Sequence, residues 1–279
     1  MAVAPALRQR SIIPGFGLTL GITLAYLGLF LVIPLCVLFV RASEAGWARF
    51  AAELASPRTL EAFRLSFSVA FLAALINAVS GLIVAWVLVR YEFPGRRLVD
   101  SLIDLPFALP TAVAGIALTS LYSVQGWLGQ PLGQAGIKVA FTPLGILIAL
   151  VFVGLPFVVR AVQPVLQDFD RELEESAAML GASRSSIIAR VVLPPILPAV
   201  MTGFTLAFAR AIGEYGSVIF IAGNMPGYTE IVPLLIVIKL EQFDYAGATV
   251  IATLMLVASF MLLLAINLLQ AFMRRRQGG

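Results

Sequence analysis

Long runs of apolar residues constrain the fold of this chain more than any other feature of its sequence. A helix needs about 20 consecutive apolar residues to cross a bilayer, and the chain offers six such runs, the third broken by Pro106 and Pro110. Hydrophobic residues make up 60% of the sequence and charged residues only 12%, and the mean hydropathy is +0.99, which excludes an ordinary soluble domain. The predicted spans are residues 12–40, 65–89, 102–122, 141–159, 198–221 and 245–273. We therefore predict an all-α membrane protein with six transmembrane helices that form a single domain over residues 1–279.

The distribution of basic residues predicts how these spans are oriented. Six crossings place both termini on one side of the membrane. The ends and loops of that side hold about twelve arginines, whereas the loops of the other side hold about six lysines and arginines, and basic loops concentrate in the cytoplasm. We therefore expect both termini in the cytoplasm. Residues 231–238 form a further apolar run that is too short to cross, so we expect a short helix near the outer face.

The loop after the fourth span, residues 160–198, has the pattern of a helix, a turn and a second helix. Asp170 can cap a first helix over residues 171–180, and Gly181 is well placed to end it in the left-handed conformation. The apolar residues of this helix share one face. They are Leu173, Ala177 and Leu180. The arrangement predicts a docking element presented from one face of the membrane.

The second helix of this loop can be capped by Ser183 or Ser185. Its apolar residues form a stripe at helical spacing. They are Ile187, Ile188, Val191 and Val192. Three prolines follow, and proline in a helix interior removes a hydrogen bond. We therefore expect Pro194, Pro195 and Pro198 to force a break before the chain re-enters the membrane.

Several catalytic chemistries are excluded by the residues that the sequence lacks. The chain has no histidine and one cysteine, Cys36, which removes histidine-based triads, histidine metal sites and internal disulfides. A phosphate-binding loop requires a Gly-Lys pair, yet the only two lysines, Lys138 and Lys239, each follow isoleucine. We therefore expect no enzyme activity and no bound cofactor in this chain. The small excess of basic residues lies in loops, which indicates membrane topology rather than nucleic-acid binding.

The fifth span holds the only charged residues deep within any predicted span, Arg210 and Glu214. Each charge at the centre of a membrane helix costs roughly 2.5–3.5 kcal/mol, and residues four apart on a helix can pair. Arg210 could draw an anion into a pathway while Glu214 limits its retention, or the two could form a closed ion pair that fixes packing. Ser217 and Asn224 could contact a hydrated oxyanion or satisfy backbone groups. Asn77, in the second span, is expected to hydrogen-bond to a neighbouring helix.

The loop of residues 160–198 also resembles a known signature. The order Glu-Ser-Ala at residues 175–177, Gly181, and Leu-Pro at residues 193–194 resembles the EAA signature of permease subunits of ATP-binding-cassette importers, although Ser176 replaces an alanine and Val191 an isoleucine. The resemblance implies the type I importer (MetI-like) permease fold. It also implies that this loop is a coupling segment that docks into a groove of a cytosolic ATPase. The residues implied in coupling are Glu174, Glu175, Ala177, Leu180, Gly181, Ala182, Ser183, Leu193 and Pro194.

The stretch of residues 209–249, with its GEYGSV and IAGN segments, resembles sulfate/thiosulfate permeases of the T (or U) type. The resemblance implies a subunit of an ATP-driven importer in the bacterial cytoplasmic membrane that forms half of a translocation pathway. The implied partners are membrane lipid, a homologous second permease of the W type, a dimeric cytosolic ATPase that binds ATP-Mg, and an extracytoplasmic sulfate-binding protein.

Two alternatives remain open at this point. Molybdate and tungstate are tetrahedral dianions like sulfate, so a molybdate or tungstate permease has a similar sequence. An anion carrier or channel that works without ATP is an alternative of a different class. Flux through the isolated chain without ATP would distinguish the latter from an importer subunit.

Overall fold

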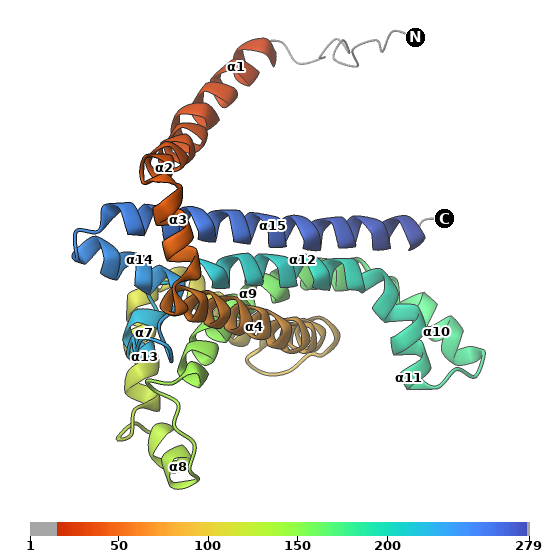
Figure 1. Ribbon diagram of the computed structural model, residues 1–279. Coiled ribbons are helices and arrows are strands. Elements are labelled where there is room, and N and C mark those ends of the chain that lie inside the picture. The colour runs from red at the N-terminus through yellow and green to blue at the C-terminus, as the bar shows by residue number, and fades with distance from the viewer. Residues whose placement is uncertain (1–15, 278–279) are drawn as a thin grey trace.

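A computed structural model describes residues 16–277, and these residues form helices joined by loops, with no strand among them. The long helices α4, α9, α12 and α15 run side by side as a bundle (Figure 1). The helices are α1 (Phe16–Leu27), η1 (a π-helical turn, Gly28–Val32), α2 (Ile33–Glu44), α3 (Gly46–Ala55), α4 (Pro57–Arg90), α5 (Arg96–Ile103), α6 (Leu105–Ala108), α7 (Thr111–Tyr122), α8 (Gly129–Gln134), α9 (Pro143–Asp168), α10 (Arg171–Met179), α11 (Arg184–Ile187), η2 (a π-helical turn, Ile188–Val192), α12 (Leu193–Ile212), α13 (Val218–Ala222), α14 (Val232–Glu241) and α15 (Tyr245–Gln277).

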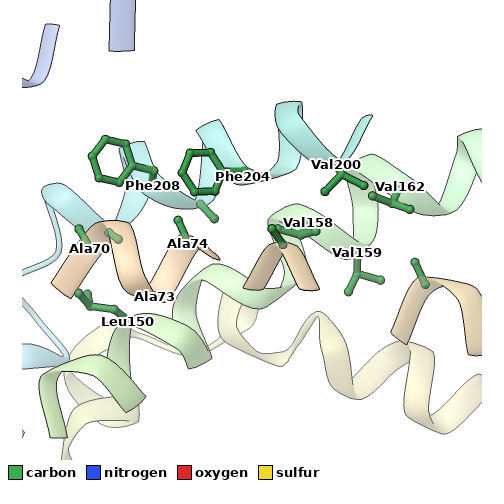
Figure 2. Close-up of a cluster of buried hydrophobic side chains, with 14 of the residues drawn as sticks. Ala70, Ala73, Ala74, Leu150, Val158, Val159, Val162, Val200, Phe204 and Phe208 are labelled. Carbon is green, nitrogen blue, oxygen red and sulfur yellow. The ribbon is translucent and has the colours of Figure 1, made fainter. Parts of the chain in front are cut away.

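The core of the bundle lies where α4, α9 and α12 meet (Figure 2). The buried face of α4 is made mostly of small residues, and apolar residues of α9 and two stacked phenylalanines of α12, Phe204 and Phe208, pack near it. Small residues allow helix backbones to approach closely, which is how helices associate in lipid where no hydrophobic driving force exists. The buried small residues of α4 include Ala70, Ala73, Ala74, Ala78, Gly81 and Ala85.

Two glycines let the three helices close around Val158 of α9. A Cβ atom added at Gly81 of α4 would lie 2.7 Å from Val158 Cβ, and one added at Gly203 of α12 would lie 2.7 Å from Val158 Cα. Neither site has room for a larger residue, because real Cβ contacts are longer. α4 and α12 therefore both pack closely on α9 at Val158.

Asn77 of α4 is fully buried against Gly154 of α9, and neither its amide nitrogen nor its amide oxygen has a hydrogen-bond partner. The expected hydrogen bond from Asn77 to a neighbouring helix is therefore wrong. Gly154 presents only backbone to Asn77, and the helical backbone there uses its own polar groups within α9.

Five helical runs among the described residues are long and apolar enough to cross a membrane, and the predicted third span is the exception. Its prolines divide residues 102–122, with Pro106 in the first turn of the short helix α6 and Pro110 capping α7. α7 is apolar but only 12 residues long. The six predicted crossings thus correspond to five long helical runs and one interrupted segment. The five runs are Phe16–Glu44, Pro57–Arg90, Pro143–Asp168, Arg184–Ile212 and Tyr245–Leu268.

The first helical run, Phe16–Glu44, projects away from the bundle (Figure 1). It contacts the rest of the protein through its C-terminal part, α2, which packs against α15 and α3. Of its side chains only Ala42 is buried. The predicted start of this span at residues 12–15 lies outside the described residues. The short helix expected at residues 231–238 is confirmed as α14, which packs against α15 at the end of the bundle.

Candidate functional site: a helical hairpin and a broken fifth helix

The hairpin formed by α10 and α11 is built by local capping, as the sequence predicts. The Asp170 carboxylate accepts a hydrogen bond of 2.9 Å from the Glu172 N–H at the start of α10. At its other end Gly181 has φ +82°, and the N–H groups of Gly181 and Ala182 donate to the carbonyls of Ala178 and Ala177. This pair of bonds is the Schellman motif, in which a left-handed residue closes the helix.

The start of the second helix is capped by Ser183, one of the two predicted serines. Its hydroxyl accepts a hydrogen bond of 3.3 Å from the Ser186 N–H. Ile187 and Val192 then turn into the core, and Val191 packs beside them. Ile188, the fourth member of the predicted stripe, is exposed instead and lines an apolar groove of about 240 Å³.

The break expected at the three prolines is wrong, because the helix runs without interruption from Arg184 to Ile212. A π-helical turn, η2, precedes the prolines, and Pro194 and Pro195 fall in the first turn of α12. A proline costs little where the backbone N–H would be unpaired, and a π turn changes the local hydrogen-bond register. The second helix of the hairpin is consequently continuous with the helix that carries Arg210.

Large apolar side chains are exposed on the hairpin among its charged and polar residues. Leu180 is 89% exposed, and Leu173 and Met179 are also exposed, whereas Ala177 packs against the core. The predicted apolar face of α10 thus divides between the bundle and solvent. Exposed apolar side chains on a loop outside the span are typical of a protein interaction surface.

One ion pair joins α10 to the bundle among the described side chains: Arg90, the last residue of α4, pairs with Glu174. The Arg90 side chain is 9% exposed, and its guanidinium lies over the rings of Trp86 and Phe169, at 5.4 and 5.8 Å from their centroids. Glu175, the next residue along α10, is exposed. Neighbouring glutamates of the hairpin therefore face different surroundings.

The predicted fifth span of residues 198–221 is not continuous. α12 ends at Ile212, and a non-helical segment of residues 213–217 leads to the short helix α13. Arg210 and Glu214 do pair, at 2.5 Å, with Glu214 in this non-helical segment. The Glu214 side chain is 1% exposed and also accepts hydrogen bonds of 2.9 Å from both the N–H and the hydroxyl of Ser217. The buried Glu214 carboxylate thereby links the last turn of α12 to the end of the non-helical segment.

The partly exposed member of this site is Arg210, whose side chain is 35% exposed. Two glycines hold the non-helical segment against α7. A Cβ atom added at Gly115 would lie 2.5 Å from the Ser217 carbonyl oxygen, and one added at Gly216 would lie 2.1 Å from the Thr111 hydroxyl. The structure therefore brings Arg210, Glu214 and Ser217 together at a helix break that α7 supports.

Asn224 lies apart from these three residues, in the turn after α13. It adopts the left-handed conformation with φ +48°, and its amide oxygen is buried without a hydrogen-bond partner. Left-handed backbone is tolerated by asparagine more readily than by most residues. Its position favours a turn-forming role over membership of the Arg210 site.

Two candidate residues were not predicted from the sequence. They are Arg90 of α4 and Arg160 of α9, which joins α9 to the carboxylates in and after α5. The Arg160 guanidinium donates to the carboxylates of Asp100 and Asp104, at 2.7 and 2.6 Å. Asp100 and Asp104 precede Arg160 by 60 and 56 residues, so their pairing produces no periodic pattern in the sequence. The helix break had one available signal, Gly213, which ends α12 as its C-cap.

The comparisons with known proteins agree with this architecture. The model of the family described as binding-protein-dependent transport system inner membrane component matches residues 77–278. The chain belongs to this family. The matched region starts after the first helical run and includes the hairpin and the broken fifth helix.

Individual relatives cover nearly the whole chain. It is 52% identical, over 92% of its length and 91% of the relative's, to a probable sulfate transport system permease protein cysT of Nephroselmis olivacea. It is 47% identical to the sulfate transport system permease protein CysT of Salmonella typhimurium, over 98% of this chain and 99% of the relative.

Solved structures confirm the fold of an importer permease. A bacterial ABC transporter involved in import of the acidic polysaccharide alginate matches with a TM-score of 0.76 at 16% identity, covering 91% of this chain and 94% of that chain. A chain of the MetNI methionine ABC transporter in an inward-facing conformation matches with a TM-score of 0.56 at 20% identity, covering 77% and 94%. The predicted MetI-like permease fold is confirmed.

Proposed function

We propose that this chain is one permease subunit of an ATP-driven importer of sulfate or thiosulfate, and that it forms half of the pathway. The observation that carries the proposal is the 47% identity to a sulfate permease over 274 residues, which extends through both the hairpin and the helix break. A shared fold alone would not specify the anion, because unrelated functions use one fold.

The site at the helix break fits an anion pathway. Glu214 is buried and its oxygens are engaged by Ser217 and Arg210, so the half-exposed guanidinium is the group that an incoming anion would meet. Guanidinium N–H groups bind oxyanions with charge-assisted hydrogen bonds. In this proposal Arg210 attracts the anion, and the nearby carboxylate keeps it from being held tightly.

The hairpin fits the role of docking to a cytosolic ATPase that binds ATP-Mg and hydrolyses ATP for the complex. Its exposed apolar surface, Leu173, Met179 and Leu180, is presented by short capped helices outside the spans. The hairpin end of the bundle is then cytoplasmic, and the C-terminal end of α15 lies at the same end (Figure 1). A second permease would complete the pathway, and an extracytoplasmic binding protein would deliver the anion at the α14 end.

The proposal is tested in liposomes that contain this chain, its second permease and its ATPase, with the binding protein outside. We expect uptake of radiolabelled sulfate that requires both the binding protein and hydrolysable ATP. Inhibition of sulfate uptake by molybdate at a concentration below that of sulfate would favour the molybdate alternative. Uptake by the isolated chain without ATP would contradict the importer assignment.

ATPase docking is tested separately by co-purification. Leu180→Asp places a charge on the exposed apolar surface of the hairpin and should reduce recovery of the ATPase with the chain. Val124→Asp is the matched control, because Val124 is similarly exposed but lies on the loop between α7 and α8. Equal recovery from both variants would contradict docking through the hairpin.

A further inference from the structure

The geometry points to Arg90 as a positioning residue that links movement of the docking hairpin to the bundle. We propose that its ion pair with Glu174 transmits displacement of α10 to α4, and from α4 to the helix that carries Arg210. This inference rests on the proposed function, in which an ATPase moves the hairpin. It adds a residue of α4, outside the loop that carries the EAA resemblance.

The Arg90 side chain is fixed from three directions. It is the last residue of α4, its guanidinium lies over Trp86 one turn earlier, and it also lies over Phe169, which caps the end of α9. Arginine on aromatic faces gains cation–π attraction. With 9% of the side chain exposed, the charge needs a partner, because a buried unpaired charge is costly.

Glu174 supplies that partner from α10, a helix that buries none of its own residues. Besides this ion pair, Ala177 packs α10 against the core. A helix with so little buried surface is oriented by its few specific contacts. The pair therefore sets which face of α10 turns to the bundle and leaves Glu175, about 100° further around the helix, on the exposed side.

A movement of Arg90 would pass from α4 to α12 through the close packing of the helices. α4 and α12 are each in close contact with α9, through Gly81 and Gly203, which both pack on Val158. Packed interfaces of this kind shift as units rather than deforming continuously. A shift of α4 would therefore carry α12, whose last turn bears Arg210.

The experiment measures sulfate uptake and ATP hydrolysis separately in liposomes that hold the complete complex. For Arg90→Gln we expect normal co-purification of the ATPase and near-normal hydrolysis. Sulfate transported per ATP should fall by about tenfold, within the usual range of coupling between sites. Glu174→Gln should lower the same ratio, and because its amide oxygen can still accept a hydrogen bond from Arg90 while carrying no charge, it tests the ion pair where Arg90→Gln assembles poorly. The double variant Arg90→Glu with Glu174→Arg should recover part of the coupling.

Arg97→Gln is the matched control, since it removes the same charge from an exposed position on α5 and should leave the ratio unchanged. The inference is overturned if Glu174→Gln matches this control, or if uptake and hydrolysis fall in equal proportion. Absence of ATP-dependent uptake by the unchanged complex would instead refute the proposed function, so the two failures are distinguishable.

Discussion

The α14 end and the hairpin end of the bundle differ in the ion pairs that hold their helices together. At the α14 end, Arg49, Glu53, Lys239 and Asp244 form four interlinked ion pairs that join α3 to α14 and to the turn before α15. At the hairpin end, the described side chains join α10 to the bundle by the single pair of Arg90 and Glu174. Each of these four interlinked charges has two partners, whereas loss of one member of a single pair leaves the other unpaired. The comparison indicates an α14 end held by several linked ion pairs, and a first hairpin helix, α10, whose described ion pair to the bundle is that of Glu174 with Arg90.

The largest effect is expected at the α14 end, where Arg58 donates two hydrogen bonds, of 2.8 and 2.6 Å, to Glu230. Glu230 is 1% exposed, while Arg58 reaches the surface. Arg58→Met would leave a buried unpaired carboxylate and should destabilise the protein by about 3 kcal/mol. The measurement is thermal unfolding in detergent. Glu230→Gln should cost less, because the freed guanidinium can turn to solvent, and a larger loss from Glu230→Gln would contradict this account.

The next largest effect is expected at the helix break that follows α12. Arg210→Gln removes the exposed charge of the site, and a charge-assisted hydrogen bond is worth about 1.5–3 kcal/mol, so we expect a loss of uptake of roughly tenfold to hundredfold. ATPase recovery should stay close to that of the unchanged protein, whereas the unfolding temperature should fall somewhat, because Glu214 keeps only its hydrogen bonds from Ser217. Uptake at the original rate by a folded, assembled Arg210→Gln protein would show that the pair only fixes packing.

A smaller effect is expected from Gly181→Ala in the hairpin. Its φ of +82° costs a residue with a Cβ about 1 kcal/mol, although no atom lies within 4 Å of an added Cβ. Because the strain is local, we expect weaker ATPase recovery with little change in unfolding temperature. Gly133→Ala is the control, since Gly133 is equally uncrowded but has no left-handed backbone. Equal recovery from both variants would contradict a conformational role for Gly181.

The smallest effect is expected from pH at the α14 end. Burial alone would raise the pKa of Asp244, but hydrogen bonds from the Gly247 N–H and Lys239 outweigh it and hold this pKa below its usual 3.8. Burial alone would lower the pKa of Lys239, but hydrogen bonds to Glu53 and Asp244 raise it above its usual 10.5.

The signs of these shifts define the pH range. The stability from Asp244 is present above pH 3.8 and lost as the pH falls through its lower folded pKa. The stability from Lys239 is present below pH 10.5 and lost as the pH rises through its higher folded pKa. The difference in unfolding temperature between the unchanged protein and Lys239→Met should therefore be constant from about pH 5 to 9. Lys138→Met, at an exposed position, is the control. A difference that varies within this range would contradict the ion-pair assignment.

The local features of the hairpin and the spans were determined by the sequence itself. Apolar runs fixed where long helices form, and Asp170, Gly181 and Ser183 set the hairpin ends through contacts with residues two to five positions away. Such signals are readable because the interacting atoms are close along the chain. The prolines after the hairpin misled the prediction, because a preceding π turn accommodates them in a continuous helix.

Only the tertiary structure decided which charges pair across the bundle and where the fifth helix breaks. Arg90 and Glu174 are 84 residues apart, and Arg58 and Glu230 are 172 apart. Nothing in local propensity links such positions, because the pairing depends on how closely α4, α9 and α12 pack at their glycines and alanines. The sequence could place a charged pair in the fifth span. That Glu214 is buried while Arg210 remains exposed depends on the packing of α7 against the break.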